Sequence, residues 1–311
     1  MKFYAKHILT LIFAILLAIN IAGCTNTRKG VSLSLHPRGL AEVENVLRLI
    51  EPDANRPTLA LVLGGGGLRG FAHVGVLSAL EELGIYPDFI VGTSAGAVVG
   101  AAYASGLTPE QIRDVALDVR ISSLIDFTLS ADGLIRGNKL ANWVDSITGE
   151  TQVEQLPRRF AAVATDLQSG QAVLLDSGSV GSAVQASSAV PGMNVPVPYH
   201  NGHLIDGGVT SLIPVRFARA MGADVVIAVD IYCQSPRAKG LGIATVISQV
   251  MHTQSCLLAK AEIVQADVLI APQLNVPGMS SKEAQERVMQ AGYDATLAAL
   301  RDWRLNAITH L

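Results

Sequence analysis

An apolar run that meets a serine between two glycines is the feature that most constrains the fold of this 311-residue chain. The stretch reads Phe89-Ile-Val-Gly92-Thr93-Ser94-Ala95-Gly96, which predicts a buried strand that turns sharply into a helix at Ser94. Gly92 and Gly96 permit unusual backbone angles and a close approach of strand and helix, which a Cβ would obstruct. The predicted helix, Ala97–Ala104, points its positive N-terminus at Ser94. The pattern favours a nucleophilic hydroxyl, although an ordinary turn of small residues has the same letters.

A glycine cluster, Gly64-Gly-Gly-Gly67-Leu-Arg-Gly70, follows the first buried strand, predicted at Leu59–Leu63. Its amides can bind an anion at the start of the next helix, Phe71–Leu83. One candidate anion is a dinucleotide pyrophosphate, because Gly65-x-Gly67-x-x-Gly70 matches the dinucleotide fingerprint. That fold also requires an acidic residue at the end of the second strand, where this chain instead has Ser94. We therefore favour an oxyanion hole.

The remaining pattern alternates short apolar runs with helical periodicity, which predicts an α/β protein with a mostly parallel sheet and helices on both faces. Further strands are predicted at Phe160–Thr165, Ala172–Leu175, Val225–Asp230 and Val268–Ala271. Further helices are predicted at Leu40–Ile50, Thr108–Leu117, Asn138–Ile147, Pro214–Met221 and Lys282–Leu300, with an apolar and polar stretch at Ile243–Val264.

A serine hydroxyl needs a base to take its proton before it attacks, and the sequence offers several candidates. His252 has the position of a hydrolase histidine, late in the chain, but it lies inside a predicted helix. His200 and His203 belong to a turn, and His73 lies in the helix that follows the glycines. Asp206 lies at a predicted strand end and precedes two glycines. These residues alone do not decide between a histidine and Asp206.

Four motifs in this order resemble the patatin-like phospholipases. They are Gly64-Gly-Gly-Gly-Leu-Arg-Gly70, Gly92-Thr-Ser-Ala-Gly96, Ala186-Ser-Ser-Ala-Val-Pro-Gly192 and Asp206-Gly-Gly208. The resemblance extends from about Leu59 to Asp230. It implies a three-layer α/β/α patatin-like fold and hydrolysis of lipid carboxylic esters, as a phospholipase, lysophospholipase or esterase, through an acyl-enzyme.

The resemblance also assigns roles to single residues. It implies a catalytic dyad of Ser94 as nucleophile and Asp206 as base, without a catalytic histidine, and an oxyanion hole at Gly65, Gly66 and Gly67. We expect a lipid or ester substrate and neither a cofactor nor a metal ion. The alternative is a noncatalytic lipoprotein that binds an anionic ligand or a partner through the glycine loop.

The N-terminal residues predict an exported protein. Lys2 and Lys6 precede an apolar run, Ile8–Ala22, which is short for a membrane span and ends in small residues. Ile21-Ala-Gly-Cys24 resembles the lipobox of bacterial lipoproteins, which implies a lipid on Cys24 and attachment to the outer membrane, facing the periplasm. An uncleaved anchor is the alternative. We expect a signal peptide at 1–23, a tether at 24–38 and a catalytic domain at 39–311.

The charge of the chain bears on its partners, and its cysteines bear on a disulfide. The formal net charge is −3, and Lys and Arg are scattered without a basic stripe, so we expect no nucleic-acid partner. In an exported protein Cys233 and Cys256 are free to form a disulfide, but the sequence does not show whether they do.

Overall fold

The computed structural model describes residues 35–47, 57–237, 240–274 and 281–309, all within one compact unit, Ser34–Leu311. The predicted signal peptide and Cys24 lie outside the described residues. Packing begins a little before the predicted domain start at residue 39, because Leu35 is buried and Arg38 forms an ion pair with Asp176. The polar composition of the predicted tether concealed these contacts.

Nine strands of the described chain form one sheet with the order β1-β7-β6-β3-β2-β10-β11, and β9 pairs with both β6 and β8. The five strands from β6 to β11 are parallel, and the strands at the β7 and β9 side are antiparallel. The bounds are β1 Arg38–Gly39, β2 Leu59–Leu63, β3 Phe89–Thr93, β6 Arg159–Asp166, β7 Ala172–Leu175, β8 Val197–Tyr199, β9 Gly202–Asp206, β10 Val225–Val229 and β11 Val268–Ile270.

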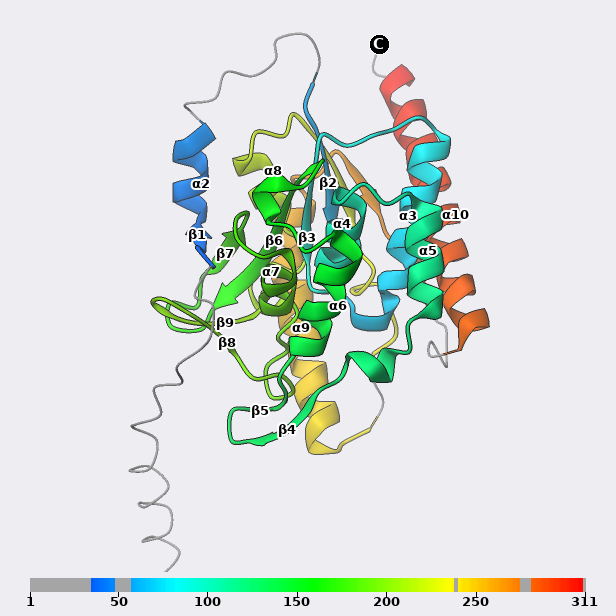
Figure 1. Ribbon diagram of the computed structural model, residues 1–311. Coiled ribbons are helices and arrows are strands. Elements are labelled where there is room, and N and C mark those ends of the chain that lie inside the picture. Colours follow the sequence, from blue (N-terminus) through cyan, green and yellow to red (C-terminus); the bar gives the residue numbers. More distant parts are fainter. Residues whose placement is uncertain (1–34, 48–56, 238–239, 275–280, 310–311) are drawn as a thin grey trace, which may run out of the picture. The chain divides into compact units, whose positions relative to one another are not determined.

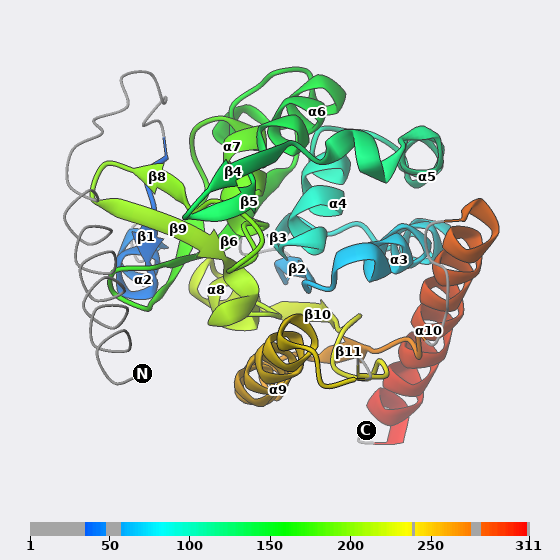
Figure 2. The same ribbon diagram turned by 90° about the horizontal axis from the view of Figure 1, so that it is seen from below.

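Helices cover both faces of this sheet, so the predicted three-layer α/β/α architecture is confirmed (Figures 1 and 2). Side chains alternate between the two layers: Leu61 and Leu63 of β2 pack with one set of helices, whereas Ala60 and Val62 pack with the other. Strands buried on both faces in this way appear in sequence as continuous apolar runs. Those runs are what made the central strands predictable.

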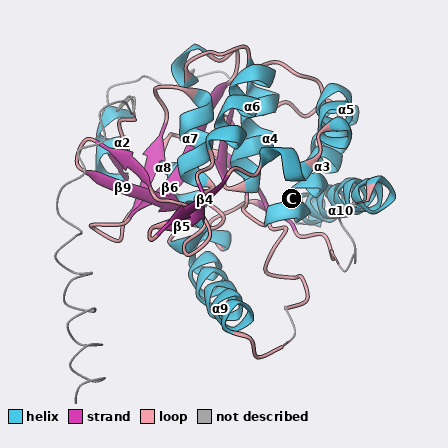
Figure 3. Cartoon of the chain, turned by 60° about the horizontal axis from the view of Figure 1, so that its bottom comes forward, coloured by secondary structure: helices cyan, strands magenta, loops and turns pink. Residues whose placement is uncertain are grey.

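The first helical layer contains α3, α4, α5, α6, α7 and α10, and the second contains α2, α8 and α9 (Figure 3). The bounds are α2 Leu40–Leu47, α3 Phe71–Glu82, α4 Ala95–Ala104, α5 Pro109–Asp118, α6 Asn138–Thr148, α7 Val180–Ser187, α8 Val215–Ala220, α9 Ile243–Ile263 and α10 Lys282–Thr309. The end of the predicted helix Leu40–Ile50 lies outside the described residues. Within the described chain, none of these helices is long and apolar enough to cross a membrane.

Several elements of the structure were not predicted. They are β1, α7, β8 with its pairing to β9, and a separate two-stranded hairpin formed by β4 (Phe127–Ser130) and β5 (Gly133–Ile135). The β4–β5 hairpin packs few of its side chains inward. The apolar residues of β4, Phe127 and Leu129, alternate with polar ones over only four positions and face outward, so the run differs from the continuous apolar runs of the central strands.

Candidate active site

The candidate site lies where two strands meet along one neighbour. Strand β3 runs parallel to β6 and ends with Thr93 opposite Val163. Strand β9 approaches from the opposite direction on the same side of β6 and ends with Asp206 opposite Ala164. The register therefore places the residue after β3, Ser94, beside the last residue of β9.

Ser94 occupies a strained turn between β3 and α4. Its φ of 53° and ψ of −120° are unusual for a residue with a side chain. The turn brings the helix against the sheet, so that a Cβ on Gly92 would lie 2.6 Å from the Gly96 carbonyl oxygen and one on Gly96 would overlap the Leu63 carbonyl. The sequence prediction of a sharp strand-to-helix elbow is confirmed. Its consequence is a half-buried, accessible hydroxyl at a helix N-terminus.

Ser94 and Asp206 are joined by a hydrogen bond in which the hydroxyl donates to the carboxylate, with Oγ and Oδ2 2.7 Å apart. The other carboxylate oxygen accepts the Gly208 N–H at 2.7 Å. Burial raises the pKa of Asp206 to about 6, although both hydrogen bonds oppose the rise. The structure thus brings together the two residues that the sequence singled out, and it gives the carboxylate more basicity than an exposed one.

Residues around the pair fix its geometry. The Ser94 N–H donates to Ser187 Oγ (2.9 Å), and the Ser187 hydroxyl donates to the Val163 carbonyl (2.6 Å). The Thr165 hydroxyl donates to the Asp206 carbonyl (3.0 Å). Sequence reasoning gave Ser187 and Thr165 no role, although Ser187 lies in the third of the four motifs. Their partners are backbone groups 24 to 93 residues away, a relation that leaves no local sequence pattern.

The glycine loop lies directly beside the pair. A Cβ on Gly65 would stand 3.3 Å from the Ser94 Cβ, so this residue must approach the serine closely. In place of the free donor predicted at Gly65, its N–H donates to the Leu212 carbonyl at 3.0 Å. The N–H groups of Gly66 and Gly67 have no hydrogen-bond partner within the described part of the chain. These two groups are the donors that the loop has available for an anion.

His73 holds the first residue of the glycine loop through a hydrogen bond. Its ring is fully buried and its Nε2 lies 2.8 Å from the Gly64 carbonyl oxygen. Burial lowers the pKa of His73 to about 4, so at neutral pH the neutral ring donates Nε2–H to that carbonyl. The packing role considered for His73 is what the structure shows.

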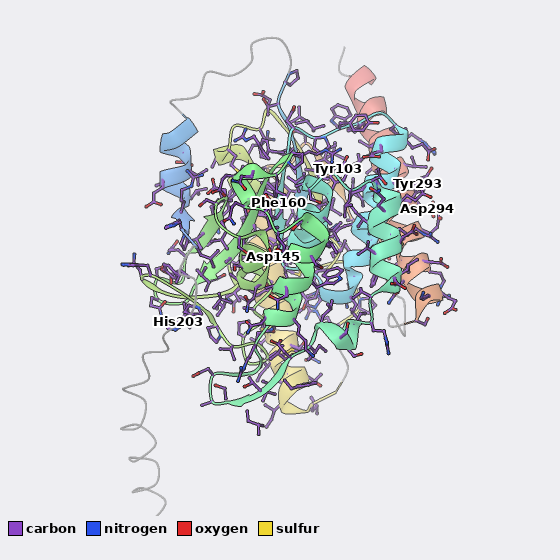
Figure 4. The ribbon with its side chains drawn as sticks, viewed as in Figure 1. Tyr103, Asp145, Phe160, His203, Tyr293 and Asp294 are labelled. Carbon is purple, nitrogen blue, oxygen red and sulfur yellow. A yellow bond between two sulfur atoms is a disulfide. The ribbon has the colours of Figure 1, made fainter. Side chains whose placement is uncertain are left out.

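Among the described residues, no histidine has a hydrogen bond to Ser94. His252 is buried on α9 with its ring 4.5 Å from that of Tyr232, and burial lowers its pKa. His203 is exposed on the β8–β9 hairpin at the sheet edge (Figure 4), and His200 in the preceding turn contacts Asn201. None of these rings has the position of a base for the serine.

The surroundings of the site include a disulfide and, in the described residues, no cluster of metal ligands. Among the described residues, no group of three His, Cys, Asp or Glu side chains is arranged to hold a metal ion. A disulfide joins Cys233, in the loop after β10, to Cys256 of α9. The same loop lies over the glycines, since a Cβ on Gly66 would come within 2.8 Å of the Ile231 side chain.

Comparison with known proteins identifies relatives of this chain. The family model described as patatin-like phospholipase matches residues 61–219, about half of the chain. An uncharacterized NTE family protein of Mycobacterium bovis is 39% identical over 180 residues, 57% of this chain. The mouse protein named patatin-like phospholipase domain-containing protein 6 is 35% identical over 185 residues, 57% of this chain and 14% of that protein. This chain spans 50% of the mycobacterial relative.

A solved structure shares the fold. The crystal structure of VipD from Legionella pneumophila superposes with a TM-score of 0.56 at 16% identity, covering 90% of this chain and 72% of VipD. At this identity the likeness concerns architecture alone.

Proposed function

Because the chain belongs to the patatin-like phospholipase family, we propose that it is a lipid acyl hydrolase that cleaves carboxylic esters with Ser94 as nucleophile and Asp206 as base. The observation that carries this proposal is the 2.7 Å hydrogen bond from the Ser94 hydroxyl to a buried carboxylate. It occurs at a strained elbow beside the N–H groups of Gly66 and Gly67, which have no partner among the described residues. A structural serine needs neither the elbow nor the donors.

The first half-reaction forms an acyl-enzyme. Ser94 Oγ attacks the ester carbonyl carbon while its proton passes to Asp206 Oδ2, and the carbonyl oxygen becomes negatively charged. The N–H groups of Gly66 and Gly67 and the N-terminus of α4 stabilise that charge. The intermediate then collapses, the bond to the alcohol oxygen breaks, and Asp206 returns the proton to the departing alcohol.

The second half-reaction regenerates the serine. Water attacks the acyl carbon and gives a proton to Asp206, and the same donors hold the second oxyanion. Collapse releases the fatty acid and returns the proton to Ser94. One carboxylate can serve both steps because a base is most effective when its pKa lies near the working pH, and burial brings Asp206 toward that range.

The direct test is covalent labelling by a fluorophosphonate, which phosphonylates activated serines. We expect one label on the unmodified protein, located by peptide mass analysis at Ser94, and none on Ser94→Ala. A folded protein that resists the reagent and hydrolyses no ester would instead support the noncatalytic binding alternative. Products from defined phospholipids, lysophospholipids and neutral esters then identify the substrate class.

We also propose that Cys24 carries lipid and holds the protein at the outer membrane, facing the periplasm. The support is the tetrapeptide that ends at Cys24 directly after the apolar run. Stable attachment requires more than one acyl chain. Mass analysis of the mature N-terminus tests this proposal: a diacylglyceryl cysteine is expected, and an unmodified Met1 would contradict it.

A further inference from the structure

Two elements near the site expose apolar side chains in unusual number. We call the first the hairpin patch: Phe127 and Leu129 of β4, Leu134 of β5 and the adjacent Met193, with Leu129 fully exposed. We call the second the α9 patch: Leu241, Ile243, Val246, Ile247 and Val250, with Ile243 83% exposed. Contiguous apolar surface of this kind marks an interaction site on a protein.

Helix α9 exposes apolar side chains on its outer face, whereas a helix that packs on a sheet in water usually has polar side chains there. Its inward side chains include His252, Ser255 and Glu262, which are buried. Its exposed side chains in the first turns include Ile243, Val246, Ile247 and Val250 of the α9 patch, together with Ser248. No Asp, Glu, Lys or Arg occurs between Leu241 and Ala259. Since water disfavours this arrangement, the outward face requires an apolar partner.

The hairpin patch is attached directly to the loop that holds Asp206. The Leu134 N–H donates to the Met193 carbonyl at 2.8 Å, and the Val195 N–H donates to the Ile135 carbonyl at 2.8 Å. A few residues earlier in the same loop, the Ala189 carbonyl accepts the Asp206 N–H at 2.8 Å. The hairpin therefore has a fixed position relative to the catalytic carboxylate.

The α9 patch is attached to the other side of the site. The disulfide between Cys233 and Cys256 and the contact of Tyr232 with His252 bind α9 to the loop after β10. The same loop supplies Ile231, which packs against Gly66. Both patches thus flank the proposed machinery, one beside Asp206 and one beside the oxyanion loop.

The two patches also lie at the same end of the molecule. In Figure 1 the β4–β5 hairpin and the start of α9 both lie at the bottom, and in Figure 3, where the bottom comes forward, they remain at the front. This is the end at which β3 terminates in Ser94. Arg136, Lys139 and Arg237, which lie within a few residues of the patches in sequence, are exposed, and so is Asp132 in the hairpin turn.

From these contacts we propose that the hairpin patch and the α9 patch rest together on a lipid bilayer and present the Ser94 site to it. The inference rests on the proposed function, because a lipid substrate reaches Ser94 from such a surface. Apolar side chains enter the acyl boundary, and the cations near them in sequence meet phosphate headgroups. A second copy of the chain at this position would cover the same patches and block the site.

The test compares two substrates with the full chain, purified in detergent and added to phosphatidylcholine and phosphatidylglycerol vesicles. The patch variants are Phe127→Ser/Leu129→Ser and Ile247→Ser/Val250→Ser. The control is Tyr86→Ser, which removes an exposed aromatic side chain just before β3, at the end of that strand opposite to Ser94. Any anchor at Cys24 is common to all of these proteins.

We expect each patch variant to hydrolyse vesicle phospholipid about tenfold more slowly while a soluble short-chain ester is cleaved at the unmodified rate. Tyr86→Ser should match the unmodified protein on both substrates. Equal vesicle rates in all variants would overturn the proposal. A patch variant that halves the particle mass in light scattering, with an unchanged vesicle rate, would assign the patches to a dimer instead.

A second readout does not depend on turnover. In the full chain carrying Trp143→Phe and Trp303→Phe, a single tryptophan is placed by Val250→Trp or, as control, by Tyr86→Trp. Brominated phospholipids should quench the first and spare the second, and equal quenching would overturn the docking. If the unmodified protein cleaves neither ester, the proposed function fails, and this quenching still tests the surface.

Discussion

Two of the serine–carboxylate pairs in the described part of the chain look alike in isolation. Ser94 donates to Asp206 and Ser211 donates to Glu262, each at 2.7 Å. Burial raises the pKa of both carboxyl groups. If a hydrogen bond to a buried carboxylate were sufficient to activate a serine, the chain would have more than one active site.

The surroundings of the two pairs differ. Ser211 has no exposed surface, and the Arg216 side chain and backbone N–H both approach the Glu262 carboxylate. Ser94 is accessible, its carboxylate has no cationic partner among the described residues, and unpaired N–H groups lie in the loop beside it. The Glu262 carboxylate, whose charge Arg216 neutralises, holds α9 against α8. The Asp206 carboxylate has no such cation in the described part of the chain and is available as a base. Access and charge compensation, more than distance, separate the two roles.

The sharpest test removes each hydroxyl in turn. Ser94→Ala should lower ester turnover by at least about 10³-fold and lower the free energy of unfolding less than Ser211→Ala does, because water at the half-buried Ser94 position can replace the lost donor to Asp206. Ser211→Ala should keep turnover and lower the free energy of unfolding by about 1 to 3 kcal/mol, since Glu262 stays buried without that donor. Ester assays and denaturant unfolding of both variants measure this, and substantial turnover by Ser94→Ala would remove the distinction.

Substitutions of the two carboxylates should likewise differ in their effect on turnover. Asp206→Asn should lose nearly as much turnover as Ser94→Ala, and the double variant should lose little more, because the pair acts as a unit. Glu262→Gln should keep most activity. In the unmodified protein kcat/KM should fall as the pH drops through about 6, where Asp206 gains its proton. A pH-independent rate between 5 and 8 would contradict a carboxylate base.

Asp206→Asn should also raise the free energy of unfolding at neutral pH, whereas most substitutions lower it. A folded-state pKa of about 6 against an ordinary 3.8 means that ionisation disfavours folding, by about 3 kcal/mol once both states are charged. The penalty is absent below pH 4 and complete above pH 6. The variant should therefore match the unmodified protein at pH 4 and exceed its unfolding free energy at pH 7, and a constant difference across this range would count against it.

A smaller effect is expected from the oxyanion loop, which only the Ser94 pair possesses. Gly66→Ala places a Cβ 2.8 Å from the Ile231 side chain, so the loop must shift and its N–H groups lose alignment. Turnover should fall about 10²-fold with less change in KM. Gly39→Ala, where the Cβ meets open space, is the control, and Ile231→Ala in the Gly66→Ala background should recover part of the rate.

The central strands and the elbow at Ser94 were predictable because their causes are local, whereas Asp206 was preferred to the histidines only through the family resemblance. Doubly covered strands give apolar runs such as Leu59–Leu63, and an elbow requires glycines at fixed positions near Ser94. The end-to-end meeting of β3 and β9 was not predictable, because it depends on register along β6. The occupied N–H of Gly65 and the support from Ser187 likewise depend on partners distant in sequence.

The last prediction concerns the histidines, which would break the comparison if one of them activated Ser94. His252→Ala should keep turnover within about threefold, because its ring packs on Tyr232 in place of contacting the serine. His203→Ala should change less, since that side chain is exposed at the sheet edge. The two variants are assayed at pH 7.5 with thermal unfolding as the control for folding. A folded His252→Ala as inactive as Ser94→Ala, together with a partly active Asp206→Asn, would make Asp206 an orienting residue. The absence of charge compensation at Asp206 would then no longer explain why Ser94 reacts and Ser211 does not.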